Sequence, residues 1–401
     1  MMQTYLLSAL VAFAVVLVLG PIVIPMLRRL KFGQVEREEG PDSHKAKQGT
    51  PTMGGLMMLC AVLAATLGFG LESAGFVLPA LLVTFAFALV GFLDDFIKVR
   101  LKRNLGLRAY QKIIAQFAIA LLVALWAYRS PQIGPALYLP ISGGSWDIGI
   151  YYIPLVMLVV IGTTNAVNLP DGLDGLAAGV SMIYSLAMTV VFALLASQAS
   201  LLGETLYGVN LEGMAVFAAA VTGACLGFMP YNKNPAKMFM GDTGSTFLGY
   251  ILATYSIQGL FKYYAIVSFA VPFLVLGLPI FDTAFAIVRR VARGQSPMTP
   301  DRGHIHHRMM DMGLNQKQTV AALYVVSSLL GLSAVVLTTS GELKAMLLLL
   351  TLAAVAYVAS RVIFPREIAE TAHEKELEQE EMQAKSAAPA PEEKEEKHEE
   401  N

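Results

Sequence analysis

Long apolar stretches recur along this chain and constrain its fold more than any other feature. Each is close to the roughly 20 residues that a helix needs to cross the hydrocarbon core of a bilayer. The sequence is 55% hydrophobic and 15% charged, whereas about a quarter of the residues in a soluble globular domain are charged. The sequence therefore predicts an all-α, polytopic membrane protein, a bundle of transmembrane helices.

Eleven segments are apolar enough to be spans, so we expect about 10–11 transmembrane helices. Short polar joins at 72–75 and 341–343 predict tight hairpins. No internal repeat is visible, which argues against a transporter built from inverted repeats. The expected spans are approximately 4–27, 54–71, 76–93, 112–128, 151–167, 176–196, 213–230, 245–260, 264–288, 320–340 and 344–364.

The two ends of the chain differ in character. The first apolar block lacks a basic leader and a small-residue cleavage site, so we interpret it as a retained helix. The last residues are rich in Glu, Lys, Ala and Pro and cannot bury a core. We predict a membrane-embedded domain over 1–364 and a disordered, charged cytoplasmic tail over 365–401.

Lysine and arginine are distributed unevenly between alternate loops. They concentrate after the first, third and ninth expected spans, whereas the opposite loops carry only Arg129, Lys262 and Lys344. Basic loops stay on the cytoplasmic side of a membrane. We therefore predict that the N-terminus lies outside and that odd-numbered spans run inward.

Five aspartates lie where apolar stretches meet polar loops, in LDDFIKV, NLPDGLDGLA and FMGDTGS. An ionised side chain in hydrocarbon costs about 2.5–3.5 kcal/mol on insertion scales, so it is rarely without a function. The predicted orientation places all three runs on the cytoplasmic side. The sequence thus predicts one acidic site for metal and phosphate at the membrane surface, formed by Asp94, Asp95, Asp171, Asp174 and Asp242.

Each run also has a simpler interpretation. Adjacent like charges raise one pKa, which suits a general base, but Asp94 and Asp95 could instead be solvated acids offset by Lys98 and Arg100. The Asp-Gly steps of NLPDGLDGLA favour close approach of a ligand and phosphate at a new helix N-terminus. Asp242 suits Mg²⁺, which takes one or two carboxylates plus waters and phosphate oxygens. The alternative for these last two runs is a helix N-cap.

Other polar groups lie on the same predicted face. His304, His306 and His307, between Arg302 and Arg308, fit diphosphate or sugar contacts better than zinc. The alternative is a basic loop that meets anionic lipid headgroups. Lys45 and Lys47 precede GTPTMGG and are further candidates, with membrane anchoring as the alternative. Asn232 and Phe239 are candidate nucleobase contacts, and the alternative for Phe239 is packing. Asp282 is interpreted as a polar contact inside the ninth span.

Together, LDD, NLPDGLDGLA, PAKMFMGDTGS and the HIHH loop resemble the hallmarks of the polyprenyl-phosphate N-acetylhexosamine-1-phosphate transferases, glycosyltransferase family 4, in that family's order. The resemblance covers about residues 20–340. It implies Mg²⁺-dependent transfer of a phosphosugar from a UDP-sugar to undecaprenyl phosphate, with release of UMP, at the cytoplasmic face of a bacterial plasma membrane. We expect no nucleic-acid partner and leave a homodimer open.

Two halves of the chain resemble different branches. EGPDSHKAKQGTPTMGG and KRNLGLRAYQK resemble the branch that uses UDP-MurNAc-pentapeptide. The segment from LPIFDTAFAIVRR through TPDRGHIHHRMMDMG resembles the GlcNAc-1-phosphate transferases. The first branch typically has ten spans and three consecutive histidines, a run that Ile305 interrupts here. We predict the muramoyl-pentapeptide donor, and hence lipid I for peptidoglycan synthesis, with UDP-GlcNAc as the alternative.

The resemblance also implies roles for individual residues. Mg²⁺ would lie on Asp242, shared with Asp171, while Asp94 would align or deprotonate the lipid phosphate and Asp95 would order the site. A membrane transporter or flippase, the competing class, would place its acids near mid-span. The resemblance implies that Asn168 and Asp174 hold the donor. Uracil would lie near Gly172, Leu173, Asn232 and Phe239. The phosphates or the sugar would be contacted by Lys47, Lys112, Arg302, His304, His306 and His307.

Overall fold

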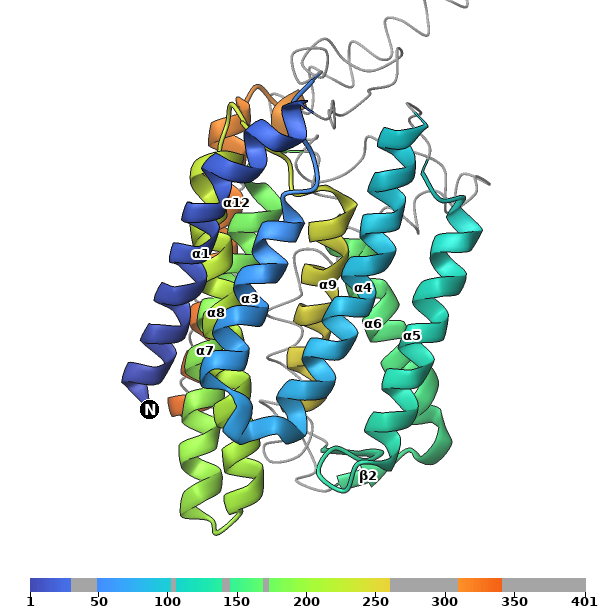
Figure 1. Ribbon diagram of the computed structural model, residues 1–401. Coiled ribbons are helices and arrows are strands. Elements are labelled where there is room, and N and C mark those ends of the chain that lie inside the picture. Colours follow the sequence, from blue (N-terminus) through green and yellow to red (C-terminus); the bar gives the residue numbers. More distant parts are fainter. Residues whose placement is uncertain (30–48, 102–105, 139–144, 169–172, 260–308, 341–401) are drawn as a thin grey trace, which may run out of the picture. The chain divides into compact units, whose positions relative to one another are not determined.

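The computed structural model describes residues 1–29, 49–101, 106–138, 145–168, 173–259 and 309–340 (Figure 1). These residues belong to one compact unit, Met1–Ala345. The spans expected at 264–288 and 344–364, and the tail expected from 365, lie outside the described residues. The domain boundary predicted at 364 therefore stays a prediction.

The described chain is almost entirely helical. Seven of its helices are long and apolar enough to cross a membrane, so the prediction of a polytopic helical membrane bundle is confirmed. The helices are α1 (Met2–Arg29), α3 (Gly55–Phe69), α4 (Ala74–Arg100), α5 (Ala109–Arg129), α6 (Tyr152–Asn168), α7 (Leu176–Leu201), α8 (Thr205–Asn232), α9 (Gly241–Gly259) and α12 (Gln316–Ser340), with 3-10 turns η1 (Leu71–Ser73) and η2 (Gly149–Tyr151).

Helix ends differ from the expected spans where polar residues continue a helix. The prediction ended the third span at 93, but α4 continues to Arg100, because helical hydrogen bonding does not stop where hydropathy falls. Similarly, α9 already begins at Gly241, so Asp242 lies in its first turn. A short antiparallel pair, β1 (Ala136–Tyr138) and β2 (Ser145–Asp147), joins α5 to α6 and was not predicted.

Helices α8 and α9 form the interior of the bundle. Helix α8 packs against α1, α3, α4 and α7, whereas α9 packs against α4, α6 and α7. Aromatic rings fill the centre, with Tyr250 stacked on Phe87 and Tyr255 edge-on to Phe217. Small residues allow close backbone approach, as is usual between helices in membranes. A Cβ atom at Gly223 of α8, for example, would lie 2.0 Å from the Ala9 carbonyl oxygen of α1.

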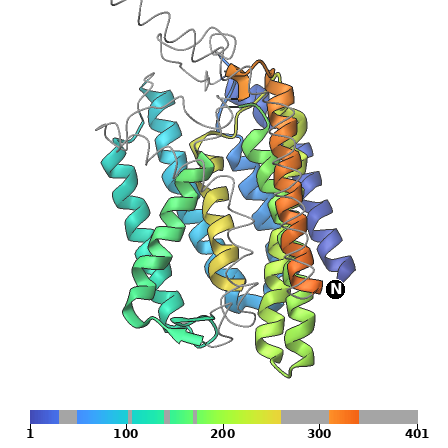
Figure 2. The ribbon, with the colours of Figure 1, turned by 180° about the vertical axis from the view of Figure 1, so that it is seen from behind.

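The helices alternate in direction, so many of their polar ends gather at one end of the bundle (Figures 1 and 2). Helices α4, α6 and α8 end there, and α5, α7, α9 and α12 begin there. Among the described lysines and arginines, Arg129 alone lies at the opposite end, the end where the chain begins. The basic residues at the first end are Arg28, Arg29, Lys98, Arg100, Arg108, Lys112, Lys233, Lys237 and Lys317.

Candidate active site

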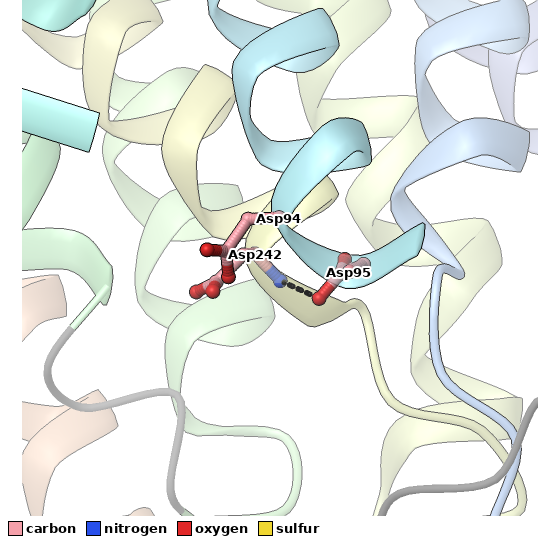
Figure 3. A group of neighbouring side chains, drawn as sticks. All are labelled: Asp94, Asp95 and Asp242. Atoms are coloured by element: carbon pink, nitrogen blue, oxygen red, sulfur yellow. Dashed lines mark hydrogen bonds between the residues drawn. The ribbon is translucent and has the colours of Figure 1, made fainter. Parts of the chain in front are cut away.

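Three of the five predicted aspartates meet where α4 approaches the start of α9. Asp94 and Asp95 lie two turns before the end of α4, and Asp242 lies in the first turn of α9. One carboxylate oxygen from each lies within 4.8 Å of the others (Figure 3). Asp94 and Asp95 are each only 3% exposed. The carboxylates therefore form a compact, largely desolvated acidic cluster.

Asp95 caps the N-terminus of α9 although it belongs to α4. Its Oδ1 accepts the backbone N–H of Asp242 at 3.1 Å, a bond drawn in Figure 3. Its Oδ2 accepts the N–H of Thr243 at 2.8 Å and the Thr243 hydroxyl at 2.7 Å. A helix N-terminus has N–H groups without intrahelical partners and a partial positive charge, and a carboxylate satisfies both. Asp95 is thus bound to protein donors through both oxygens.

Asp94 has different partners. Its Oδ1 accepts the backbone N–H of Leu107, at 2.7 Å, from the segment that leads into α5. Its Oδ2 lies 2.5 Å from the Lys98 ammonium, one turn further along α4. The same ammonium also contacts Oδ2 of Asp242. Lys98 therefore bridges the two carboxylates and offsets their mutual repulsion.

Asp242 is paired with two lysines. Besides Lys98, its Oδ1 lies 3.4 Å from the ammonium of Lys112, in the first turn of α5. Burial alone would raise the pKa of the Asp242 carboxyl, but Lys112, a hydrogen bond with Asp94, and Lys98 together outweigh burial and hold this pKa well below its usual range. Asp242 is therefore an ionised carboxylate at neutral pH.

The first turn of α9 also connects the other motifs. The Ser245 hydroxyl donates to Oδ1 of Asn168, the last residue of α6, at 2.5 Å. On the other side, the GTPTMGG loop pairs with the backbone before α9: Gly55 donates to the Met240 carbonyl at 2.9 Å. Gly241 has a φ of +72°, and a Cβ there would lie 2.4 Å from Oδ2 of Asp95. These contacts explain why small residues surround Asp242.

The second Asp-Gly step of NLPDGLDGLA lies against the loop between α8 and α9. Oδ2 of Asp174 accepts the amide of Asn234 at 3.0 Å and the N–H of Ala236 at 3.1 Å. Leu173 is 7% exposed. Gly175, with a φ of +83°, is the N-cap of α7. This Asp-Gly step therefore lies at the start of a helix. Both interpretations of the sequence, a phosphate site at a helix N-terminus and a helix N-cap, required a helix to begin here.

Asn232 and Phe239, the expected nucleobase contacts, are both buried. Oδ1 of Asn232 accepts the N–H of Gly175 at 3.1 Å, and its Nδ2 donates to the Met238 carbonyl at 3.0 Å. In this conformation the Asn232 amide binds backbone, and 9% of Phe239 is exposed. Their contact with a ligand stays a prediction.

Several predicted residues cannot be placed, and several unpredicted ones belong to the site. Lys98 was interpreted only as a neighbouring positive charge, although its spacing of four residues from Asp94 predicts a pair on one helix face. Thr243 and Ser245 were not singled out, because their roles depend on the helices that α9 meets. The predicted residues outside the described chain are Lys45, Lys47, Asp171, Gly172, Asp282, Arg302, His304, His306 and His307.

The donor atoms of the cluster fit a hard divalent cation. Asp94, Asp95 and Asp242 offer carboxylate oxygens, the ligands that Mg²⁺ prefers. Both oxygens of Asp95 are bonded to donors at the start of α9, whereas the oxygens of Asp242 form ion pairs with Lys98 and Lys112. Asp242 is therefore better placed than Asp95 to exchange a lysine contact for a cation.

Comparisons with known proteins found similar sequences. Residues 77–260 match the model of glycosyl transferase family 4. The chain is 47% identical over 250 residues to a phospho-N-acetylmuramoyl-pentapeptide-transferase of Clostridioides difficile, covering 62% of this chain and 73% of the relative. It is 38% identical over 351 residues to that of Desulfitobacterium hafniense, covering 85% and 99%. Against that of Halalkalibacterium halodurans it is 40% identical over 343 residues, covering 84% and 98%.

Proposed function

The chain belongs to glycosyl transferase family 4, with the phospho-N-acetylmuramoyl-pentapeptide-transferases, and on this premise we propose that it forms lipid I. It would transfer phospho-N-acetylmuramoyl-pentapeptide from the UDP donor to undecaprenyl phosphate and release UMP. The observation that carries the proposal is the alignment with such transferases over nearly their full length. It favours the muramoyl donor over UDP-GlcNAc, the alternative suggested by the C-terminal motifs.

The reaction exchanges one phosphoric anhydride for another. An oxygen of undecaprenyl phosphate attacks the sugar-linked phosphorus of the donor, and a new P–O–P bond forms. The bond between the two donor phosphates breaks, and its bridging oxygen leaves with UMP. Phosphoryl transfer depends mainly on positioning and on neutralising charge. Lys98, Lys112 and the three carboxylates around the start of α9 offer groups for positioning the substrates and for neutralising their charge.

Individual residues would divide this work. Asp242, together with Asp171, would hold Mg²⁺, which when bound neutralises the donor diphosphate. Asp94 would align the acceptor phosphate and take up its proton. Lys98 and Lys112 carry the positive charges closest to Asp242 and would contact phosphate oxygens. Asp95 would keep α9, and with it Asp242, in position.

The donor would lie beside the second Asp-Gly step. Asn168, Asp174, Gly172 and Leu173 would bind the nucleotide, and Arg302, His304, His306, His307 and Lys47 would contact phosphates or sugar. Asn232 would act through its bond to Gly175, and Phe239 would contact uracil.

We place this site at the cytoplasmic face of a bacterial plasma membrane. The concentration of lysine and arginine at the site's end of the bundle supports that orientation. The lipid tail of the acceptor would stay in the bilayer while its phosphate reaches the acidic cluster. Helices α1, α4 and α5, whose apolar faces are largely exposed, fit a lipid surrounding.

The test is UMP release by the purified protein with undecaprenyl phosphate and Mg²⁺. We expect release with UDP-MurNAc-pentapeptide, much less with UDP-GlcNAc, and none in EDTA until Mg²⁺ is restored. Asp242→Asn should abolish release. The matched control is Asp147→Asn, an exposed aspartate on the hairpin at the opposite end. Release by Asp242→Asn near the wild-type rate would overturn the metal assignment, and preference for UDP-GlcNAc would overturn the donor.

A further inference from the structure

Gly175 is held on both sides by helices that lie far from it in the sequence. Its N–H donates to Asn232 of α8 at 3.1 Å, and its carbonyl accepts the hydroxyl of Tyr324, from α12, at 2.5 Å. Gly175 has a φ of +83°, a conformation that favours glycine. The start of α7 is therefore held by two hydrogen bonds of Gly175, one between its N–H and α8 and one between its carbonyl and α12.

A second connection reaches α12 through the neighbouring aspartate. The Asn234 amide donates one hydrogen bond to Oδ2 of Asp174 at 3.0 Å and another to Oε1 of Gln316 at 2.9 Å. Gln316 is the first residue of α12. Two consecutive residues of the Asp-Gly step are thus connected to α12, one directly and one through Asn234.

Helix α12 packs against α7 (Figure 2). Gly179 lies one turn after Gly175, and a Cβ there would be 2.0 Å from the Tyr324 hydroxyl. The hydroxyl also lies 3.9 Å from the sulfur of Met229. The absence of a side chain at Gly179 leaves the space through which Tyr324 reaches the Gly175 carbonyl.

We infer that α12 is a positioning element for the donor, acting through Tyr324 and Gln316 on Leu173, Asp174 and Gly175. The inference rests on the proposed function, which places the UDP donor against Leu173 and Asp174, the two residues before Gly175. The carboxylates proposed for the acceptor and the metal are held differently, by α4, α5 and α9. Loosening the contact with α12 should therefore weaken donor binding and leave the acceptor side unchanged.

The test removes one hydroxyl and keeps the ring. In Tyr324→Phe, the loss of a single hydrogen bond should raise the KM for UDP-MurNAc-pentapeptide about two- to tenfold. The KM for undecaprenyl phosphate and kcat should stay at wild-type values. Amide hydrogen exchange over residues 173–179 should become faster. Gly179→Ala, which displaces the same hydroxyl by a different route, should give the same pattern.

Tyr231→Phe is the matched control. Its hydroxyl also donates to a backbone carbonyl, that of Leu17 at 2.9 Å, but it connects α8 to α1. A purely structural role for Tyr324 predicts equal effects in both variants, or a fall in kcat alone, and either result would overturn the inference. An unchanged donor KM in Tyr324→Phe would overturn it as well. Failure of the wild-type protein to release UMP would instead reject the proposed function.

Discussion

The division of roles between Asp94 and Asp95 can be tested by removing one negative charge at a time. Asp95→Asn keeps the shape of the side chain but leaves a single carbonyl oxygen to accept bonds. Three donors now point at the Asp95 carboxylate: two backbone N–H groups and the Thr243 hydroxyl. The new amide NH₂ group would face at least one of these donors. Part of the N-terminus of α9 would then be buried without a partner.

The magnitude follows from these contacts. A buried N–H left without an acceptor costs about 1–3 kcal/mol. We therefore expect Asp95→Asn to lower the free energy of unfolding by about 1–3 kcal/mol. Asp94 accepts one backbone N–H, from Leu107, and does not cap α9. Asp94→Asn should reduce activity with a much smaller loss of stability.

A thiol-reactive dye offers the assay, because Cys225 is buried in α8 while Cys60 is exposed. In a Cys60→Ala background, Cys225 is the one remaining thiol of the chain and reports unfolding as the temperature rises. Asp95→Asn should unfold at a temperature several degrees below both the wild type and Asp94→Asn, and its amides at 242 and 243 should exchange faster. Equal unfolding temperatures for the two variants would refute the assignment of Asp95 as the cap of α9.

Three further changes test the surroundings of Asp242. Gly241→Ala should reduce both thermal stability and UMP release, because a Cβ there would meet Asp95. The control Gly68→Ala, which has open space around it, should reduce neither, and equal thermal unfolding curves for the two variants would contradict the prediction. Lys112→Met should lower kcat/KM about 10- to 100-fold, with Lys112→Arg retaining more activity; equal losses would exclude a role for the charge. Because its pKa is lowered, Asp242 stabilises the fold above about pH 4 and loses this contribution below it. The stability difference between wild type and Asp242→Asn, measured from pH 7 to pH 3, should be constant down to about pH 4 and then shrink.

The meeting of LDD and GDTGS was predictable, because it depends on a signal that is linear in the sequence. Asp174 of NLPDGLDGLA, expected in the same site, does not belong to the cluster. A carboxylate at the edge of an apolar stretch marks a depth in the membrane, and the parity of the spans assigns each run to one side. Asp94, Asp95 and Asp242 do form a cluster. Their membrane side and ligands stay predictions.

The separate roles of Asp94 and Asp95 were not predictable, because the two residues differ only by about 100° of rotation around α4. Which one faces α9 depends on how α4 and α9 pack. The burial of Asn232 likewise depends on tertiary contact, here with Gly175 and the loop before α9. The β1–β2 pair was missed because three-residue strands are too short to show an alternating pattern.

The capping of α9 by a residue of α4 also has a consequence for how the protein is made. Asp95 leaves the ribosome 148 positions before Thr243, the residue that donates two of its three hydrogen bonds. Until α9 is inserted, this carboxylate must remain hydrated at the membrane surface, because burying it alone would be costly. In a nascent chain arrested before Gly241, α4 would therefore lack α9, whose backbone N–H groups allow the last turns of α4 to be buried. Assembly of the acidic cluster is a late step of biogenesis, since it requires two helices that are synthesised far apart in time.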